Sequence, residues 1–213
     1  MFNYTMDTYE MKREIVNFSK RINNGVNKST QKFVMDMHLI RSIKRVLKRG
    51  DILCMYPEAR YSPCGITSYI PDSVGSLVKL NKVPVVTIVH HGNYLHSPFW
   101  NFRKKRKVPL YTTFTQILTA EDVEKMSVDE INNVVRKSLE YDEYRYQKEN
   151  GIKITEPFRA EGLHKILYQC PACKTEHKMN SKGAEIFCEE CGKRWTLLED
   201  GNLQANQGET EFS

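Results

Sequence analysis

The sequence lacks any long hydrophobic run. No stretch reaches the roughly 18 consecutive apolar residues that a membrane-spanning helix needs. The first residues, Met1 to Arg13, are polar and contain no apolar core of a secretion signal. We therefore expect a cytoplasmic protein with no bilayer-spanning segment, and peripheral association with the inner membrane surface stays open.

Internal repeats and low-complexity segments are also absent. The 213 residues are 40% hydrophobic and 27% charged, which is ordinary for soluble globular domains. This length suffices for one medium domain and one small domain, and the composition changes near residue 160. We expect an α/β domain over residues 1–160, a small β module over 161–200 and a tail over 201–213.

Positive charge exceeds negative charge, and the excess is uneven. The formal net charge is +6, and the densest basic run extends from Arg103 to Lys107. Such an excess favours anionic partners, which include lipid headgroups, phosphorylated substrates and nucleic acid. The run itself fits either a solvated loop or a segment attracted to an anionic membrane, where each Lys or Arg contributes about 1 kcal/mol.

Hydrophobic periodicity predicts the first elements. Apolar residues at helical spacing predict a helix over residues 39–48 that Gly50 ends. The apolar run 52–56 then predicts a short buried strand, which Pro57 closes because proline cannot donate to a sheet ladder.

Further elements follow in alternation. A helix is expected over residues 74–80, capped by Asp72 or Ser73, and strands are expected over 83–89 and 108–117. Ser127 and Glu130 form a capping box for a long helix that continues to residue 149. This order predicts an α/β layer structure with some parallel strand pairing.

Four of the six cysteines form two Cys-x-x-Cys pairs, which fourteen residues separate. Two such turns on adjacent hairpins bring four thiolates to one tetrahedral Zn²⁺, and a filled ligand set makes the metal structural. The sequence therefore predicts a zinc ribbon whose apolar cover includes Phe187 and Trp195. Its metal ligands would be Cys170, Cys173, Cys188 and Cys191.

Other interpretations of the cysteine module remain. The pairs could form a redox dithiol, and His177 could replace one ligand. Basic residues around the module suit nucleic acid or a merely solvated surface; they are Lys174, Lys178, Lys182, Lys193 and Arg194.

A short polar loop follows the expected strand 52–56. It reads Tyr-Pro-Glu-Ala-Arg-Tyr-Ser over residues 56–62, and it resembles the Phe-Pro-Glu-Gly-Thr-Arg-Ser motif of the glycerolipid (lysophosphatidate) acyltransferase family. Ala59 stands where that motif has glycine, and Arg60 comes one residue early. The Lys-Arg-Gly ending at Gly50 and the later Val-Pro-Val strand at 83–85 also resemble family segments.

The resemblance covers roughly residues 36–120 and implies a partial acyltransferase-type sheet with flanking helices. It also implies that Glu58, Arg60 and Ser62 bind substrate, with Arg60 gripping the phosphate of a glycerophosphate acceptor through paired donors. The implied acyl donor is acyl-CoA or acyl-carrier protein. Without the flanking segments, Glu58 and Arg60 would read as a surface ion pair.

The catalytic His-x-x-x-x-Asp motif of that family is absent. None of the six histidines is followed five residues later by aspartate. In the family this histidine is the general base and lies well before the Pro-Glu segment, so we expect no catalytic residue in this chain and a missing upstream region. His90 and His91 follow a core strand and offer an alternative base.

Three functional hypotheses follow. The first is an acyltransferase of phospholipid synthesis that is inactive in this chain alone. The second is a zinc-ribbon module that binds nucleic acid or a protein, and the third is a non-catalytic scaffold derived from the enzyme.

Overall fold

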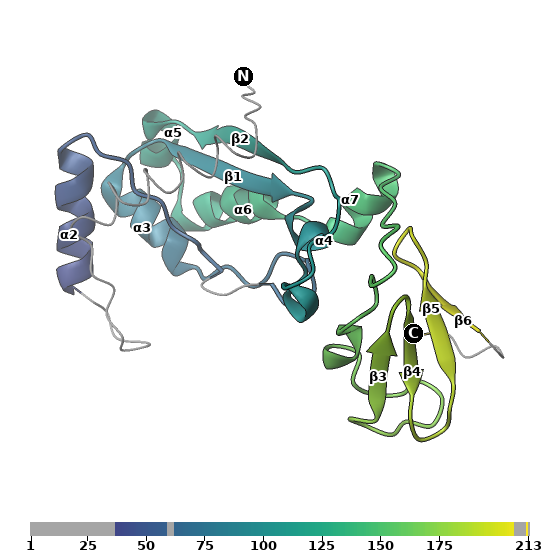
Figure 1. The fold of residues 1–213 in the computed structure, drawn as a ribbon. Coiled ribbons are helices and arrows are strands. Elements are labelled where there is room, and N and C mark those ends of the chain that lie inside the picture. The colour runs from purple at the N-terminus through teal and green to yellow at the C-terminus, as the bar shows by residue number, and fades with distance from the viewer. Residues whose placement is uncertain (1–36, 59–61, 207–211, 213) are drawn as a thin grey trace. The chain divides into compact units, whose positions relative to one another are not determined.

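The computed structural model describes residues 37–58, 62–206 and 212. They form two compact units, which we treat separately. The first contains the described residues up to 58 with Tyr69–Val89 and Tyr111–Leu139, and the second contains the described residues of Tyr61–Ser68, His90–Leu110 and Glu140–Ser213. Both helices and small sheets are present (Figure 1), so the mixed character expected from the sequence is confirmed.

The first unit contains four helices and a strand pair. The helices are α2 (Met37–Lys48), α3 (Ser73–Asn81), α5 (Ala120–Lys125) and α6 (Val128–Leu139), and the strands are β1 (Val85–His91) and β2 (Tyr111–Leu118). Helix α3 packs on α5 and α6, which both contact β2 (Figure 1). The core between them consists of Ile70, Val74, Leu118, Val123, Ile131 and Val135.

The β1–β2 pair is antiparallel. Thr87 Oγ1 in β1 donates to the carbonyl of Thr115 in β2, and Gly92 just after β1 lies against the carbonyl of Pro109 just before β2. The two chains therefore run in opposite directions, which corrects the parallel pairing that the element order suggested. The intervening segment is long because it forms part of the second unit.

Most of the expected helices and strands exist, but residues 51–56 do not form a strand. Ile52 is 61% exposed and Tyr56 is 78% exposed. The prediction of a buried strand here was wrong because an apolar run alone does not specify a partner strand. Helix α2 ends as expected, with Gly50 at φ 78° after the last turn.

Helix α3 begins differently from the expectation. Asp72 occupies the N-cap position, but its side chain makes no capping hydrogen bond and pairs with Arg136 instead. The amide of Gly75 in the first turn donates to Asn132 Oδ1 of α6 at 2.8 Å. A neighbouring helix thus satisfies an amide that a cap residue usually serves.

The second unit begins with short helices. These are α4 (Asn93–His96), the 3₁₀ helix η1 (Phe99–Asn101), α7 (Glu143–Glu149) and the 3₁₀ helix η2 (Leu163–Lys165). Helix α7 is separate from α6, which corrects the single long helix expected to residue 149. Asp142 creates the new start because its side chain accepts hydrogen bonds from the amides of Tyr144 and Arg145.

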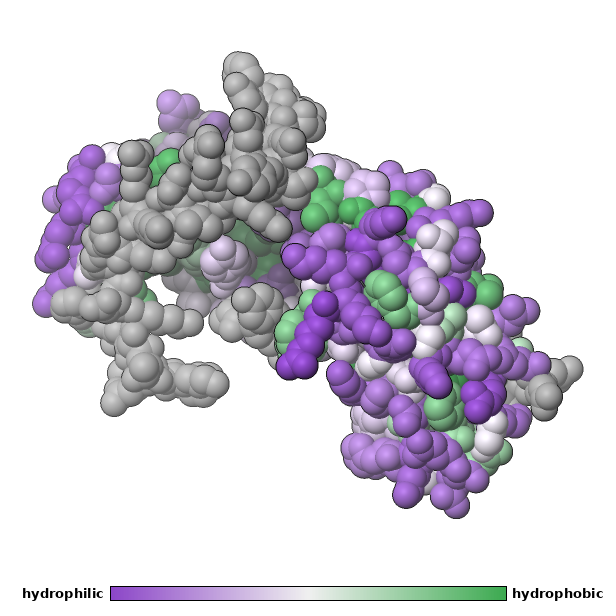
Figure 2. All heavy atoms as spheres, viewed as in Figure 1, coloured by the Kyte–Doolittle hydropathy of each residue, from purple (hydrophilic) through white to green (hydrophobic). Residues whose placement is uncertain are grey.

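The remaining strands form one antiparallel sheet in the order β3-β4-β5-β6 (Figure 1). They are β3 (Met179–Lys182), β4 (Glu185–Cys188), β5 (Arg194–Leu197) and β6 (Leu203–Ala205). Strand β6 lies within residues 201–213, where the sequence suggested a tail. Figure 2 shows one face of the part of the chain that contains this sheet. Most residues on that face are hydrophilic, and the hydrophobic ones form small patches.

Candidate metal centre

The two Cys-x-x-Cys segments fold into matching turns. In the first, the amide of Lys174 donates to the carbonyl of Cys170 at 2.9 Å, and the amide of Cys170 donates to the carbonyl of Thr175 at 2.9 Å. In the second, Gly192 and Lys193 make the same two bonds with Cys188, at 3.0 and 2.9 Å. Identical backbone geometry therefore presents both cysteine pairs.

The four cysteine sulfurs lie close together around a common centre. The Sγ atoms of Cys170, Cys173, Cys188 and Cys191 all lie within 4.8 Å of one another. Cys170 Sγ lies 3.7 Å from Cys191 Sγ, and Cys173 Sγ lies 3.7 Å from Cys188 Sγ. Four sulfurs arranged tetrahedrally about 2.3 Å from a zinc ion would be separated by about 3.8 Å. The cluster thus fits a tetrahedral metal ion bound by four thiolates.

Backbone donors and burial shape the chemistry of the thiols. Burial raises the pKa of Cys170 to about 12, partly offset by hydrogen bonds from the amides of Cys173 and Ala172. Hydrogen bonds from the Thr175 side chain and backbone lower the pKa of Cys173 to about 6. A metal ion must therefore displace the proton of the buried Cys170, whereas Cys173 is readily deprotonated.

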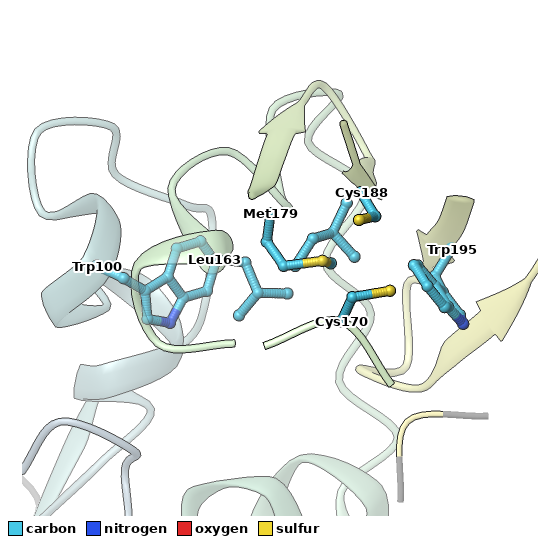
Figure 3. Close-up of a cluster of buried hydrophobic side chains, with 7 residues drawn as sticks. Trp100, Leu163, Cys170, Met179, Cys188 and Trp195 are labelled. Carbon is cyan, nitrogen blue, oxygen red and sulfur yellow. The ribbon is translucent and has the colours of Figure 1, made fainter. Parts of the chain in front are cut away.

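An apolar cluster supports the two buried ligands. Cys170 and Cys188 pack with Met179, Ile186 and Trp195. Figure 3 shows the two cysteine side chains in the same cluster as Met179 and Trp195. Two further members of the cluster are Trp100 and Leu163. The expected cover is thus confirmed for Trp195, which is completely buried.

Phe187 takes a more peripheral place than the sequence suggested. It is half-buried, and the Arg194 guanidinium lies 4.5 Å from the centre of its ring. Sequence reasoning missed Trp100, which lies outside the expected module. In the sequence, Trp100 is visible only as part of an aromatic and basic stretch. Its packing against the cysteine-containing sheet becomes evident only in the folded structure.

The other candidate ligands lie outside the sulfur cluster. His177 does not replace a cysteine, because its ring stacks on Tyr168 with 5.1 Å between ring centres. Cys54 and Cys64 are exposed free cysteines. Within the described part of the chain, the four clustered cysteines form the one group of three or more His, Cys, Asp or Glu side chains positioned to hold a metal.

The expected substrate-binding residues are only partly within the described structure. Glu58 is half-buried in a turn with Pro57, and Arg60 lies outside the described residues. Ser62 closes a local turn: its Oγ donates to the Ile66 carbonyl at 2.8 Å and accepts from the Ile66 amide at 3.1 Å. Phosphate binding by these three residues stays a prediction.

The histidine pair ends strand β1. His91 lies edge-on to Tyr141 with 5.0 Å between ring centres and contacts Tyr146 at 5.3 Å. Glu143 is buried nearby, and its carboxylate accepts from the amide of Leu95 at 3.4 Å. Burial raises the pKa of this carboxyl. The aromatic surroundings of His91 are those of a packed side chain.

Among the described residues, no helix combines the length and the apolar character that crossing a membrane requires. No significant match to the chain was found among protein-family models, curated proteins or solved structures.

Proposed function

We propose that the cysteine cluster holds one Zn²⁺ as a structural centre of the second unit. The support is the arrangement of the sulfurs. Cys170 Sγ and Cys191 Sγ are 3.7 Å apart, as are Cys173 Sγ and Cys188 Sγ, and this distance matches the edge of a ZnS₄ tetrahedron. Four thiolates complete the coordination and leave no position for a substrate. The ion would then tie the two cysteine turns, and the sheet between them, into one folded unit.

Metal analysis tests this proposal. The purified chain should contain one zinc per molecule by inductively coupled plasma mass spectrometry, and Cys188→Ser should abolish it. The double variant Cys54→Ser/Cys64→Ser is the matched control, because it removes two thiols that lie outside the cluster. Loss of zinc from the control, or full zinc in Cys188→Ser, would overturn the assignment.

We further propose that the chain is the phosphate-binding part of a glycerolipid acyltransferase. The support is the ordered set of family-like segments around the loop 56–62, together with a helix and strand, α3 and β1, after that loop. In this proposal Arg60 grips the phosphate of a glycerophosphate acceptor, and Glu58 and Ser62 orient it. The acyl group would come from acyl-CoA or acyl-carrier protein.

Ligand binding separates this proposal from a scaffold role. Calorimetry with glycerol 3-phosphate and with lysophosphatidate should detect an interaction that Arg60→Ala weakens by about tenfold or more, as expected for a lost charge-assisted pair. Lys48→Ala, an exposed cation on α2, is the charge-matched control. Equal binding by both variants, or none by the wild type, would leave the scaffold hypothesis in its place. We expect no acyl transfer by this chain alone.

Charge argues against a nucleic-acid role for the ribbon. Residues 161–200 contain six Lys or Arg and seven Asp or Glu, a formal charge of −1. Four thiolates with one Zn²⁺ would make this segment more negative. Arg194 is also paired with Glu185 at 3.1 Å. Nucleic-acid affinity depends on a basic surface that neutralises several phosphates, and this segment has no net positive charge to supply it.

A further inference from the structure

The segment around η1 exposes two phenylalanine rings on a firmly anchored turn. Phe99 is 58% exposed and Phe102 is 62% exposed, while Trp100 between them is buried in the core of the second unit. Side chains three residues apart in a 3₁₀ helix lie one above the other. The turn therefore presents both rings to solvent on one side and holds its position through Trp100.

The basic run that follows divides into anchors and free cations. Arg106 is buried, its guanidinium lies 4.5 Å from the centre of the Trp100 ring, and it donates to the carbonyl of Arg159. Lys104 pairs with Glu161. Arg103, Lys105 and Lys107 are exposed, and the described structure places no carboxylate in an ion pair with any of them.

A hollow lies beside Phe102, one of the two exposed rings. Its volume is about 330 Å³, and it is lined by Trp100, Asn101, Phe102, Arg103 and Lys165. The ammonium of Lys165 donates to the Trp100 carbonyl at 3.2 Å on its wall. Two cations and an aromatic ring thus border one concave surface.

We propose that this surface, residues 99–107 with Lys165, docks the protein on an anionic lipid membrane. Phe99 and Phe102 would enter the boundary between headgroups and acyl chains, and Arg103, Lys105 and Lys107 would attract the headgroup phosphates. The hollow beside Phe102 would take one anionic headgroup between Arg103 and Lys165. Because the surface lies outside the loop 56–62, the proposal is independent of the proposed acyl transfer.

The observations favour a lipid surface over nucleic acid. The phenyl rings carry no hydrogen-bonding group, so transferring them from water to the apolar part of a membrane lowers the free energy. The free cations occupy one short loop, whereas tight nucleic-acid binding needs an extended basic track of many phosphate contacts. A basic loop that carries exposed apolar rings suits a membrane interface.

Vesicle co-sedimentation tests the proposal with the full chain in its zinc-loaded form. We expect binding to vesicles of phosphatidylcholine and phosphatidylglycerol in equal parts, and at most weak binding to pure phosphatidylcholine. Arg103→Gln/Lys105→Gln should weaken the partition about 25-fold, since each surface cation contributes roughly fivefold. Lys148→Gln/Lys153→Gln, which removes two exposed cations outside the surface, should change it by less than about twofold.

The aromatic part has its own test. Phe99→Ser/Phe102→Ser should weaken binding by about tenfold or more without altering the tryptophan fluorescence of the free protein, because both rings are exposed. In Phe102→Trp, vesicles containing brominated lipid should quench the new tryptophan. Absence of quenching, equal loss in the control variant, or tighter binding to single-stranded RNA than to anionic vesicles would each overturn the proposal.

Discussion

Lys174 and Gly192 occupy the same position in the two cysteine turns, and both have left-handed backbone, at φ 62° and φ 73°. In each turn this residue donates its amide to the carbonyl of the first cysteine. Glycine adopts this conformation freely, whereas an L-residue such as lysine is strained by roughly 1–2 kcal/mol. The sequence supplies glycine in only one of two equivalent places.

Substitutions at these two positions should therefore change the free energy of unfolding in opposite directions. Lys174→Gly should raise the free energy of unfolding by about 0.5 kcal/mol, because the relief of strain exceeds the entropy cost of glycine. Gly192→Ala should lower it by about 1 kcal/mol, since its added Cβ would meet nothing within 4 Å and only backbone strain changes. Equal effects of the same sign would contradict this.

Tryptophan fluorescence is the suitable measurement. The chain contains two tryptophans, Trp100 and Trp195, and both belong to the second unit. Urea unfolding of the zinc-loaded protein, followed by this signal, reports on the unit that carries the mutations.

The metal centre was readable from the sequence because its signal is local. A Cys-x-x-Cys turn fixes the spacing of two sulfurs within a few residues, and the capping box of Ser127 and Glu130 is equally local. Both predictions were confirmed at the level of geometry. By contrast, the role of Trp100 depends on contacts with residues more than sixty positions away, and no local pattern encodes such a contact.

The break between α6 and α7 shows the same limit. The sequence predicted one helix that continues through the charged, tyrosine-rich stretch 141–149. Asp142 ends that continuity because its carboxylate binds two amides of the next turn, and Thr67 and Tyr141 exchange hydrogen bonds that hold the break open. The role of the loop 56–62 was predicted from a family resemblance alone. A local sequence pattern does not determine where the Arg60 side chain lies relative to Glu58.

Gly75 should not tolerate a side chain. A Cβ at this position would lie 2.6 Å from the Asn132 side chain. That side chain accepts a hydrogen bond from the Gly75 amide and donates one to the Asp72 carbonyl at 3.0 Å. Gly75→Ala should destabilise the first unit by about 1–3 kcal/mol through overpacking. Far-UV circular dichroism during urea unfolding measures this change.

The partner variant provides the control. Asn132→Ala leaves the Gly75 amide without its acceptor and should cost about 1–3 kcal/mol. Because the clash needs both side chains, Gly75→Ala/Asn132→Ala should cost less than the sum of the single changes. Simple additivity would mean that the two residues are not coupled as the contact implies.

The Ser127 and Glu130 capping box should give the first unit a pH-dependent term. Hydrogen bonds from the Ser127 backbone and side chain lower the pKa of the Glu130 carboxyl. A lowered pKa contributes stability above the ordinary carboxyl pKa, and this contribution is lost as the pH falls through the lowered value. The difference in stability between the wild type and Glu130→Gln should therefore shrink on acidification.

Ser127→Ala should cost about 1 kcal/mol at neutral pH through loss of the cap. In the Ser127→Ala background, the pH dependence attributed to Glu130 should become smaller without disappearing, because the side-chain bond is lost while the backbone amide at position 127 still donates to the carboxylate. Glu121→Gln, an exposed carboxyl in the first turn of α5, controls for general charge effects. An unchanged pH dependence in Ser127→Ala would show that the Ser127 side chain does not contribute to it.

Glu143 should act in the opposite direction in the second unit. Burial raises the pKa of its carboxyl despite hydrogen bonds from Tyr141 and from the amides of Leu95, Tyr94 and Gly92. A raised pKa makes the folded state hold a proton that the unfolded chain releases. Its contribution is therefore fully present below the ordinary carboxyl pKa and is lost as the pH rises through the raised value.

The stability of the wild type relative to Glu143→Gln should consequently fall as the pH rises from the ordinary carboxyl pKa through the raised one, and then level off. Glu149→Gln, which removes an exposed carboxyl on the same helix α7, is the control for general charge effects. Tryptophan fluorescence during urea unfolding of the zinc-loaded protein gives the measurement, and comparing variants cancels any common effect of acid on the metal centre. A relative stability that rises with pH would mean that the hydrogen bonds to the carboxylate outweigh its burial, and that Glu143 fastens the turn after β1 as an anion.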